Sequence, residues 1–200
     1  MSFTFRGRSP LLALVIGAWA SVGSSVAPTP DVAPDDPDIA VVSTFLSGRD
    51  LKVTARLSPA LPKDVETRLV SGLPTTTVWR VALYISRPLW FDGKKDERRY
   101  EVTATYRPAA GDFSLERRLD GRLLETRVVP SREEAGRALS ELAAVPCFRM
   151  GEHLVGKPLV VRVRCAYAPG VALGVIPTTF ETGWSRSTVF QWDGRGGEAP

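Results

Sequence analysis

The chain of 200 residues is poor in the residue types on which most enzymes depend. It has two cysteines, two methionines and a single histidine, His153. A Ser-His-Asp or Cys-His arrangement needs a histidine as its base. His153 stands in the loop-like segment RMGEHLVGK, and the chain has no G-x-S-x-G element. One histidine and two distant cysteines also lack the ligand spacing of a zinc site, so we expect no catalytic residue and no metal ligand.

Cofactor motifs are missing as well. The sequence has no phosphate-binding glycine loop and no dinucleotide fingerprint, so no cofactor is expected. A carboxylate pair for glycoside hydrolysis assembles in space rather than in sequence, which leaves a hydrolase as an alternative that no pattern favours. We expect a protein that is not an enzyme.

The excess of positive charge is small. Arg6 and Arg8 supply two of the 26 basic residues, and without them 24 face 22 acidic residues, a net charge of +2. A charge of that size does not predict binding to nucleic acid or to an anionic membrane.

The first 20 residues are typical of an export signal. Arg6 and Arg8 precede the apolar run LLALVIGA at 11–18, and Ala18-Trp19-Ala20 forms an A-x-A cleavage site. We predict a signal peptide over 1–20 and a periplasmic or secreted protein; an uncleaved membrane anchor is the alternative. No later segment is apolar enough to span a membrane.

The rest of the chain divides into three parts. Residues 21–38 are rich in proline and aspartate, which predicts an extended linker. From residue 39 the pattern changes to β, and a single domain is expected over 39–193. Residues 194–200 are expected to form a flexible tail.

Alternating apolar residues predict the first strands. Two strands are expected over 39–58, joined near residues 47–50, and a helix follows that ends at Gly72. The next strand begins at Thr75 in RLVSGLPTTTVWRVALYISRPLWFDG and ends before Pro88. Its core face should carry Trp79, Val81, Leu83 and Ile85, and its solvated face Arg80, Ala82 and Tyr84.

A hairpin and a second helix follow. Asp120-Gly121 is a two-residue turn motif, and it would place Phe113, Leu115, Leu119, Leu124 and Val128 on one face, with Glu116, Arg118, Glu125 and Arg127 on the other. Ser131 and Glu134 form a capping box for the helix, which Pro146 should close. Two more strands are expected, in PLVVRVRCAY and in GWSRSTVFQW.

These elements predict a mainly β fold. Seven or eight strands with short connections and two short helices indicate an antiparallel β-sandwich with the helices at its edges or ends.

Three groups of residues are candidates for a function. Trp90 and Phe91 could form an exposed aromatic surface for a ligand or partner, or Trp90 could fold back over the edge of the core. Arg118 and Arg127 could form a ligand site or a solvated sheet face. Cys147 and Cys165 could be bonded in an oxidising compartment, or Cys165 could be a buried thiol.

The order of several segments resembles one family of exported bacterial proteins, domain of unknown function 4390. The segments are LKVTARLSPALPKDVETRLVSGLP, WRVALYISRPLWFDG, EVTATYRPAAGDFSLER, SREEAGRALSEL and GWSRSTVFQW, over about residues 39–192. The two cysteines and the polar turn GKKDERR depart from the family pattern. The resemblance implies an envelope location and a β-rich fold but no site. Members are often encoded beside sensor histidine kinases, which implies a link to envelope signalling.

Two functions are therefore expected. The first is a non-enzymatic interaction or accessory domain with a protein partner in the cell envelope. The alternative is a carrier of a small apolar or lipid ligand between the sheets, using Trp79, Trp90, Trp184 and Trp192.

The export signal makes a prediction about the mature protein. Cleavage after Ala20 gives an N-terminus at Ser21, because the A-x-A site ends there. Intact-mass analysis of periplasmic protein should show this, and retention of Met1 would contradict it.

Overall fold

Strands make up most of the part of the chain that the computed structural model describes, namely residues 37–59, 61–87, 89–169 and 180–195. The described residues lie in one unit, Ala33–Pro200. The predicted signal peptide, most of the predicted linker and residues 196–200 of the tail lie outside them. No helix among the described residues is long and apolar enough to cross a membrane.

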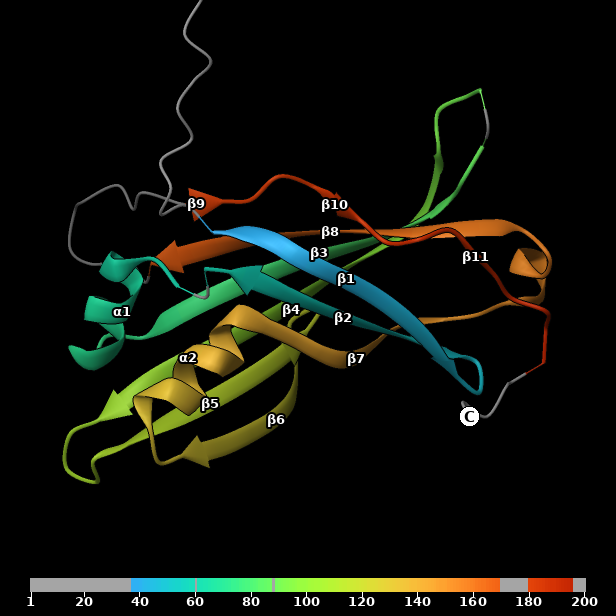
Figure 1. The fold of residues 1–200 in the computed structure, drawn as a ribbon. Coiled ribbons are helices and arrows are strands. Elements are labelled where there is room, and N and C mark those ends of the chain that lie inside the picture. Colours follow the sequence, from blue (N-terminus) through green and yellow to red (C-terminus); the bar gives the residue numbers. More distant parts are fainter. Residues whose placement is uncertain (1–36, 60, 88, 170–179, 196–200) are drawn as a thin grey trace, which may run out of the picture. The chain divides into compact units, whose positions relative to one another are not determined.

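Two antiparallel sheets face each other, as predicted, in a sandwich-like arrangement (Figure 1). The smaller sheet has the order β1-β2-β7, formed by β1 (Asp38–Ser47), β2 (Asp50–Ser58) and β7 (Glu141–Arg149). The larger sheet has the order β10-β8-β3-β4-β5-β6. Its strands are β3 (Thr75–Ile85), β4 (Gly93–Arg107), β5 (Asp112–Leu119), β6 (Arg122–Val129), β8 (Pro158–Pro169) and β10 (Ser185–Arg186), with β9 (Phe180–Glu181) and β11 (Phe190–Gln191) also paired to β8.

Two short helices complete the core. They are α1 (Lys63–Val70) and α2 (Arg132–Ser140), and both contact β3 and β4 of the larger sheet on the side where the smaller sheet lies (Figure 1). A short 3-10 helix, Glu152–Leu154, precedes β8. The core thus lies between the larger sheet on one side and the smaller sheet and the helices on the other.

The predicted helix end, hairpin turn and helix cap have the backbone conformations and the hydrogen bond expected for them. Gly72 follows α1 with a φ of 82°, and Asp120 and Gly121 have φ values of 51° and 80°, which fits a type I′ hairpin turn. The Ser131 side chain accepts a hydrogen bond of 3.2 Å from the Glu134 amide at the start of α2. These three signatures depend on neighbouring residues alone, so they could be interpreted from sequence.

The alternation of β2, β3 and β8 is confirmed on the core side. The inward residues of β2 (Leu51, Val53, Ala55, Leu57) and of β8 (Leu159, Val161, Val163, Cys165) are buried, as are Trp79, Val81 and Leu83 of β3. The other face of β3 is not uniformly solvated, because Ala82 is fully buried and Val78 nearly so. The prediction of a solvated face at Ala82 is therefore wrong. Tyr84, two residues on, lies beneath the guanidinium of Arg162, whose Cζ is 4.7 Å from the ring centre.

The predicted faces of β6 are wrong by one residue. Leu124 and Val128 are half exposed, and Val129 occupies the core position opposite Phe113. The register shifts between Arg117, which lies opposite Glu125, and Arg118, which lies opposite Leu123, so that Leu124 is an extra residue in β6. Because side chains alternate with a period of two, this bulge exchanges the two faces of β6.

The helix predicted to run to Pro146 ends at Ser140, and β7 takes the following residues. Leu142 is buried there as a strand residue. Pro146 fits within β7 because that strand is at the edge of the smaller sheet, where a missing N–H is tolerated. Apolar residues at 138–143 suit either element, so the sequence pattern did not distinguish them.

The last predicted strand is broken into β9, β10 and β11, which follow the free edge of β8 in turn. At two gaps between these strands a hydroxyl replaces the missing carbonyl: Thr182 Oγ1 accepts from the Cys165 amide and Ser187 Oγ from the Val161 amide, both at 3.0 Å. Trp192 is buried, whereas Trp184 is 42% exposed, so the two do not share one buried face.

The burial of β3 gives a test of its register. Leu83→Ala should lower the free energy of unfolding by ~2–5 kcal/mol, because it leaves a cavity in the core. Arg80→Gln, on the exposed side of the same strand, should change it by about 0.5 kcal/mol or less. Denaturant midpoints of the two variants would measure this, and equal midpoints would contradict the register.

Candidate interaction site

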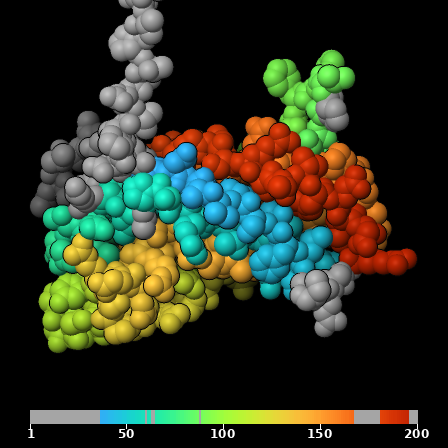
Figure 2. Space-filling model, viewed as in Figure 1, coloured from blue at the N-terminus to red at the C-terminus, as the bar shows by residue number. Residues whose placement is uncertain are grey.

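The segment that connects β3 to β4 projects from the surface of the protein, and we call it the arm. It is described over residues 86–87 and 89–92, and it is the green segment that stands out in Figures 1 and 2. The arm continues two long strands that pair with each other from Thr75 to Ile85. The flanking strands therefore fix where the arm leaves the sheet.

The apex of the arm consists of three consecutive apolar residues. Leu89, Trp90 and Phe91 are 103%, 76% and 90% exposed, more than any other large apolar residue in the described part of the chain. Trp90 is therefore not folded back over the edge of the core. An exposed aromatic residue alone is ordinary, but three large apolar side chains together on a projecting turn form a patch that calls for a partner.

An ion-pair cluster at the base holds the arm. Asp92 Oδ2 lies 2.6 Å from Nη2 of Arg162 on β8 and 3.8 Å from Nη2 of Arg186 on β10. Asp92 Oδ1 accepts a hydrogen bond of 3.3 Å from the Arg87 amide, and Arg186 also donates to the Ser86 hydroxyl at 3.0 Å. The carboxylate thus joins the arm to two other strands of the larger sheet.

The environment of Asp92 keeps it ionised. Its side chain is only 9% exposed, and this desolvation raises its pKa. The hydrogen bonds from Arg162 and from the Arg87 amide, with the charge of Arg186, act in the opposite sense and outweigh it, so the pKa of Asp92 lies below its ordinary value. The turn itself is closed by a bond of 3.3 Å from the Trp90 amide to the Arg87 carbonyl.

Basic residues flank the apex along the chain. Arg87 precedes it, and Lys94 and Lys95 follow it at the start of β4; all three are exposed. Lys94 is paired with Glu97. Arg87 and Lys95 form no ion pair with a carboxylate among the described residues.

A row of three arginines crosses the outer face of the larger sheet. Arg80 of β3 lies directly opposite Arg164 of β8 and Arg99 of β4. Like charges in such positions repel. Arg164 is paired with Glu181 at 2.7 Å and Arg99 with Glu101 at 2.5 Å, whereas Arg80 has no carboxylate partner in the described part of the chain.

The two arginines singled out from the sequence are not brought together. Arg118 is on the outer face and pairs with Glu116 at 3.0 Å. Arg127 lies opposite Leu115 on the inner side, where it lines an open cleft of about 260 Å³ with Arg117, Glu134 and Arg137. The bulge in β6 places them on opposite faces of the sheet, and neither is part of the arm.

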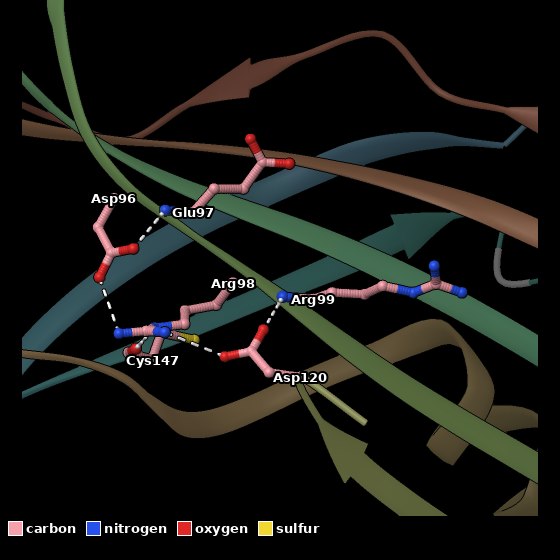
Figure 3. A network of polar contacts seen from close by, with 6 residues as sticks. All are labelled: Asp96, Glu97, Arg98, Arg99, Asp120 and Cys147. Carbon is pink, nitrogen blue, oxygen red and sulfur yellow. Dashed lines mark hydrogen bonds and ion pairs between the residues drawn. The ribbon is translucent and has the colours of Figure 1, made fainter. Parts of the chain in front are cut away.

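Arg98 joins the two sheets, and no sequence pattern marked it. Its Nε donates to the Cys147 carbonyl on β7 at 3.2 Å, while its Nη atoms contact Asp96 at 2.8 Å and Asp120 at 3.1 Å (Figure 3). Asp120 also accepts from the Arg99 amide at 2.9 Å. The Asp120 carboxylate therefore takes part both in the contact between the sheets and in the hairpin turn, which indicates a structural role for Asp120.

The cysteines are free and buried in the structure. Desolvation raises the pKa of the Cys147 thiol to about 12, and burial raises that of Cys165 further. Such thiols are protonated and poorly nucleophilic at neutral pH. His153 is exposed in the 3-10 turn, and no group of three or more His, Cys, Asp or Glu side chains among the described residues could hold a metal ion.

The Asp92 cluster makes a prediction about the arm. Asp92→Asn removes the charge that Arg162 and Arg186 share, so the amides of residues 86–87 and 89–92 should exchange hydrogen several-fold faster in mass-spectrometric exchange at neutral pH. Because the pKa of Asp92 is lowered in the folded state, its contribution is present at neutral pH and is lost only as the pH falls through that value, below 3.8.

A matched control is Asp112→Asn, which breaks the exposed pair with Arg107 at the other end of β4. It should accelerate exchange near its own site and leave the arm unchanged. Unchanged exchange of the arm in Asp92→Asn would show that the cluster does not hold it.

Comparison with known proteins identifies a family but no activity. No curated protein matches the chain, and no solved structure does. A family model described as "Domain of unknown function (DUF4390)" matches residues 35–169, which include the arm, both helices and all of β1 to β8. This match covers more than half of the 200 residues. The chain therefore belongs to the family of domain of unknown function 4390.

Proposed function

We propose that this protein is an exported, non-enzymatic interaction domain of the bacterial cell envelope, and that the apex of the arm makes its contact. The observation that carries the proposal is the nearly complete exposure of Leu89, Trp90 and Phe91. Leaving three large apolar side chains in water has no structural benefit, because each would stabilise the fold if it were buried. Their position makes sense if a partner covers them.

The construction of the arm supports a binding role. Aromatic residues dominate the energy of many interfaces because they bury a large area with few rotatable bonds. Here they lie on a short connection between two long paired strands and are held at the base by the Asp92 cluster. A contact residue that is positioned before binding loses less conformational entropy on binding.

The chemistry around the arm supports binding rather than catalysis. Asp92 is held in ion pairs with Arg162 and Arg186, and Glu97 in one with Lys94. A carboxylate that is engaged in this way is poorly placed to transfer a proton. The proposal therefore assigns no catalytic step to this surface.

The alternative of a ligand carrier has less support. The space between the sheets contains packed side chains, among them Trp79, Leu83 and Trp192, each 2% exposed or less. A cleft of about 520 Å³ lies instead beside α1 and α2, and two of its arginines, Arg56 and Arg132, are paired with Glu141 and Glu66. That cleft is lined by Leu57, Leu61 and Leu69 as well as by charged residues, and it is open to solvent rather than enclosed between the sheets.

Site-specific photo-crosslinking tests the proposal in cells. A photoreactive residue at position 90 should give adducts in envelope fractions, whereas one at position 45, an exposed phenylalanine on β1, should not. Excess unlabelled wild-type protein should compete for the adduct. The variant Leu89→Ser/Trp90→Ser/Phe91→Ser should not compete. Absence of any adduct at position 90, with protein or with lipid, would contradict the proposal.

A further inference from the structure

We infer that the surface contacted by the arm is an anionic lipid bilayer, into whose interface Leu89, Trp90 and Phe91 insert. This inference rests on the proposed function and names its partner. It differs from the usual protein interface, whose apolar residues lie within a broad complementary patch.

The form of the apex suits a bilayer. The three side chains are consecutive and extend into solvent from a projecting turn. They can therefore enter a fluid surface together without a preformed pocket. Tryptophan prefers the boundary between headgroups and acyl chains, because its ring is apolar and its N–H is polar. Apolar groups of peripheral proteins enter that boundary by roughly 5–10 Å.

The charge around the apex selects anionic lipid. Arg87 and Lys95 are exposed beside it and form no ion pair with a carboxylate among the described residues, whereas Lys94 is paired with Glu97. The one carboxylate of the described arm, Asp92, is turned back toward β8 and β10, and its charge is taken up there by Arg162 and Arg186. Because two guanidinium groups share this one carboxylate, one positive charge at the base remains in excess. The arm therefore presents positive charge to whatever its apex contacts.

The small net charge of the whole chain does not weaken this inference, because charges beyond the Debye length, about 8–10 Å in physiological salt, are largely screened. The row formed by Arg80, Arg99 and Arg164 lies too far from the apex to act on the same lipid surface. Arg80 lies five residues before the end of β3, which is about 17 Å at ~3.3 Å per residue. We therefore assign the row no part in the contact, and only the cations of the arm and its base count.

Vesicle flotation with the full-length chain tests the inference. Wild-type protein should float with vesicles of phosphatidylethanolamine and phosphatidylglycerol and bind vesicles of phosphatidylcholine alone at least about tenfold more weakly, since each basic residue near an anionic surface contributes about fivefold in affinity. High salt should reduce the binding. All variants keep residues 1–36, so they differ from the wild type only at the substituted residues.

Two variants separate the apolar and the electrostatic contributions. Leu89→Ser/Trp90→Ser/Phe91→Ser should reduce binding to anionic vesicles by more than about tenfold, because it removes the three apolar side chains that enter the bilayer. Its matched control, Val41→Ser/Phe45→Ser, removes exposed apolar residues from the smaller sheet and should bind like the wild type. Arg87→Gln/Lys95→Gln should reduce binding by on the order of tenfold, while Arg122→Gln/Lys157→Gln, which removes the same charge elsewhere, should not. Equal denaturant midpoints would show that all four variants fold.

The outcomes distinguish this inference from the proposed function. Binding that depends on the apex and on Arg87 and Lys95 supports the bilayer. Equal binding to both lipid compositions, or binding that the apex variant retains, overturns the inference. If no vesicle binds while the photoreactive residue at position 90 gives a competed protein adduct, the inference is overturned and the proposed function stands with a protein partner. If neither lipid nor protein contacts the apex, both are wrong.

Discussion

The pairing of β3 with both of its neighbours is the constraint on which the rest of the structure depends. Over its whole length, from Thr75 to Ile85, β3 forms antiparallel ladders with β4 on one side and β8 on the other. These ladders satisfy the backbone polar groups that burial would otherwise leave unpaired. They also align Trp79 with Tyr100 and Cys165 on the core side, so one register positions the buried residues of three strands at once.

The same ladders determine where the arm lies. β3 and β4 pair up to Ile85 and Gly93, so the apex leaves the sheet at a defined place. The ladder between β3 and β8 brings Arg162 to the base of the arm, although it is 70 residues from Asp92 in the sequence. The scaffold and the candidate site are therefore connected physically: the strands that form the centre of the core also carry the charged groups that hold the arm.

One edge of each sheet is occupied or interrupted, in different ways. The chain after β8 follows its free edge as β9, β10 and β11, and the hydroxyls of Thr182 and Ser187 fill the gaps in hydrogen bonding. In the smaller sheet, β7 places Pro146 at an edge. Arg98 then links this sheet to the larger one through the Cys147 carbonyl (Figure 3). An edge that is occupied or interrupted offers less backbone for pairing with another chain, which leaves the apex of the arm as the most exposed apolar feature of the described residues.

The sequence by itself determined the β-rich class, the family, the core faces of β2, β3 and β8, and the turns at Gly72 and Asp120-Gly121. Each of these follows from neighbouring residues or from a period of two, which are local properties of the chain. It also marked Trp90 and Phe91, but not their exposure, because an apolar residue after a strand can pack back or project. Only the tertiary structure decided that question, together with the bulge that exchanges the faces of β6, the strand that residues 141–145 form where a helix was predicted, and the partners of Asp92 and Arg98. These features depend on contacts between residues far apart in the chain, and a local pattern carries no information about which distant side chain will neutralise a charge or cover an apolar surface.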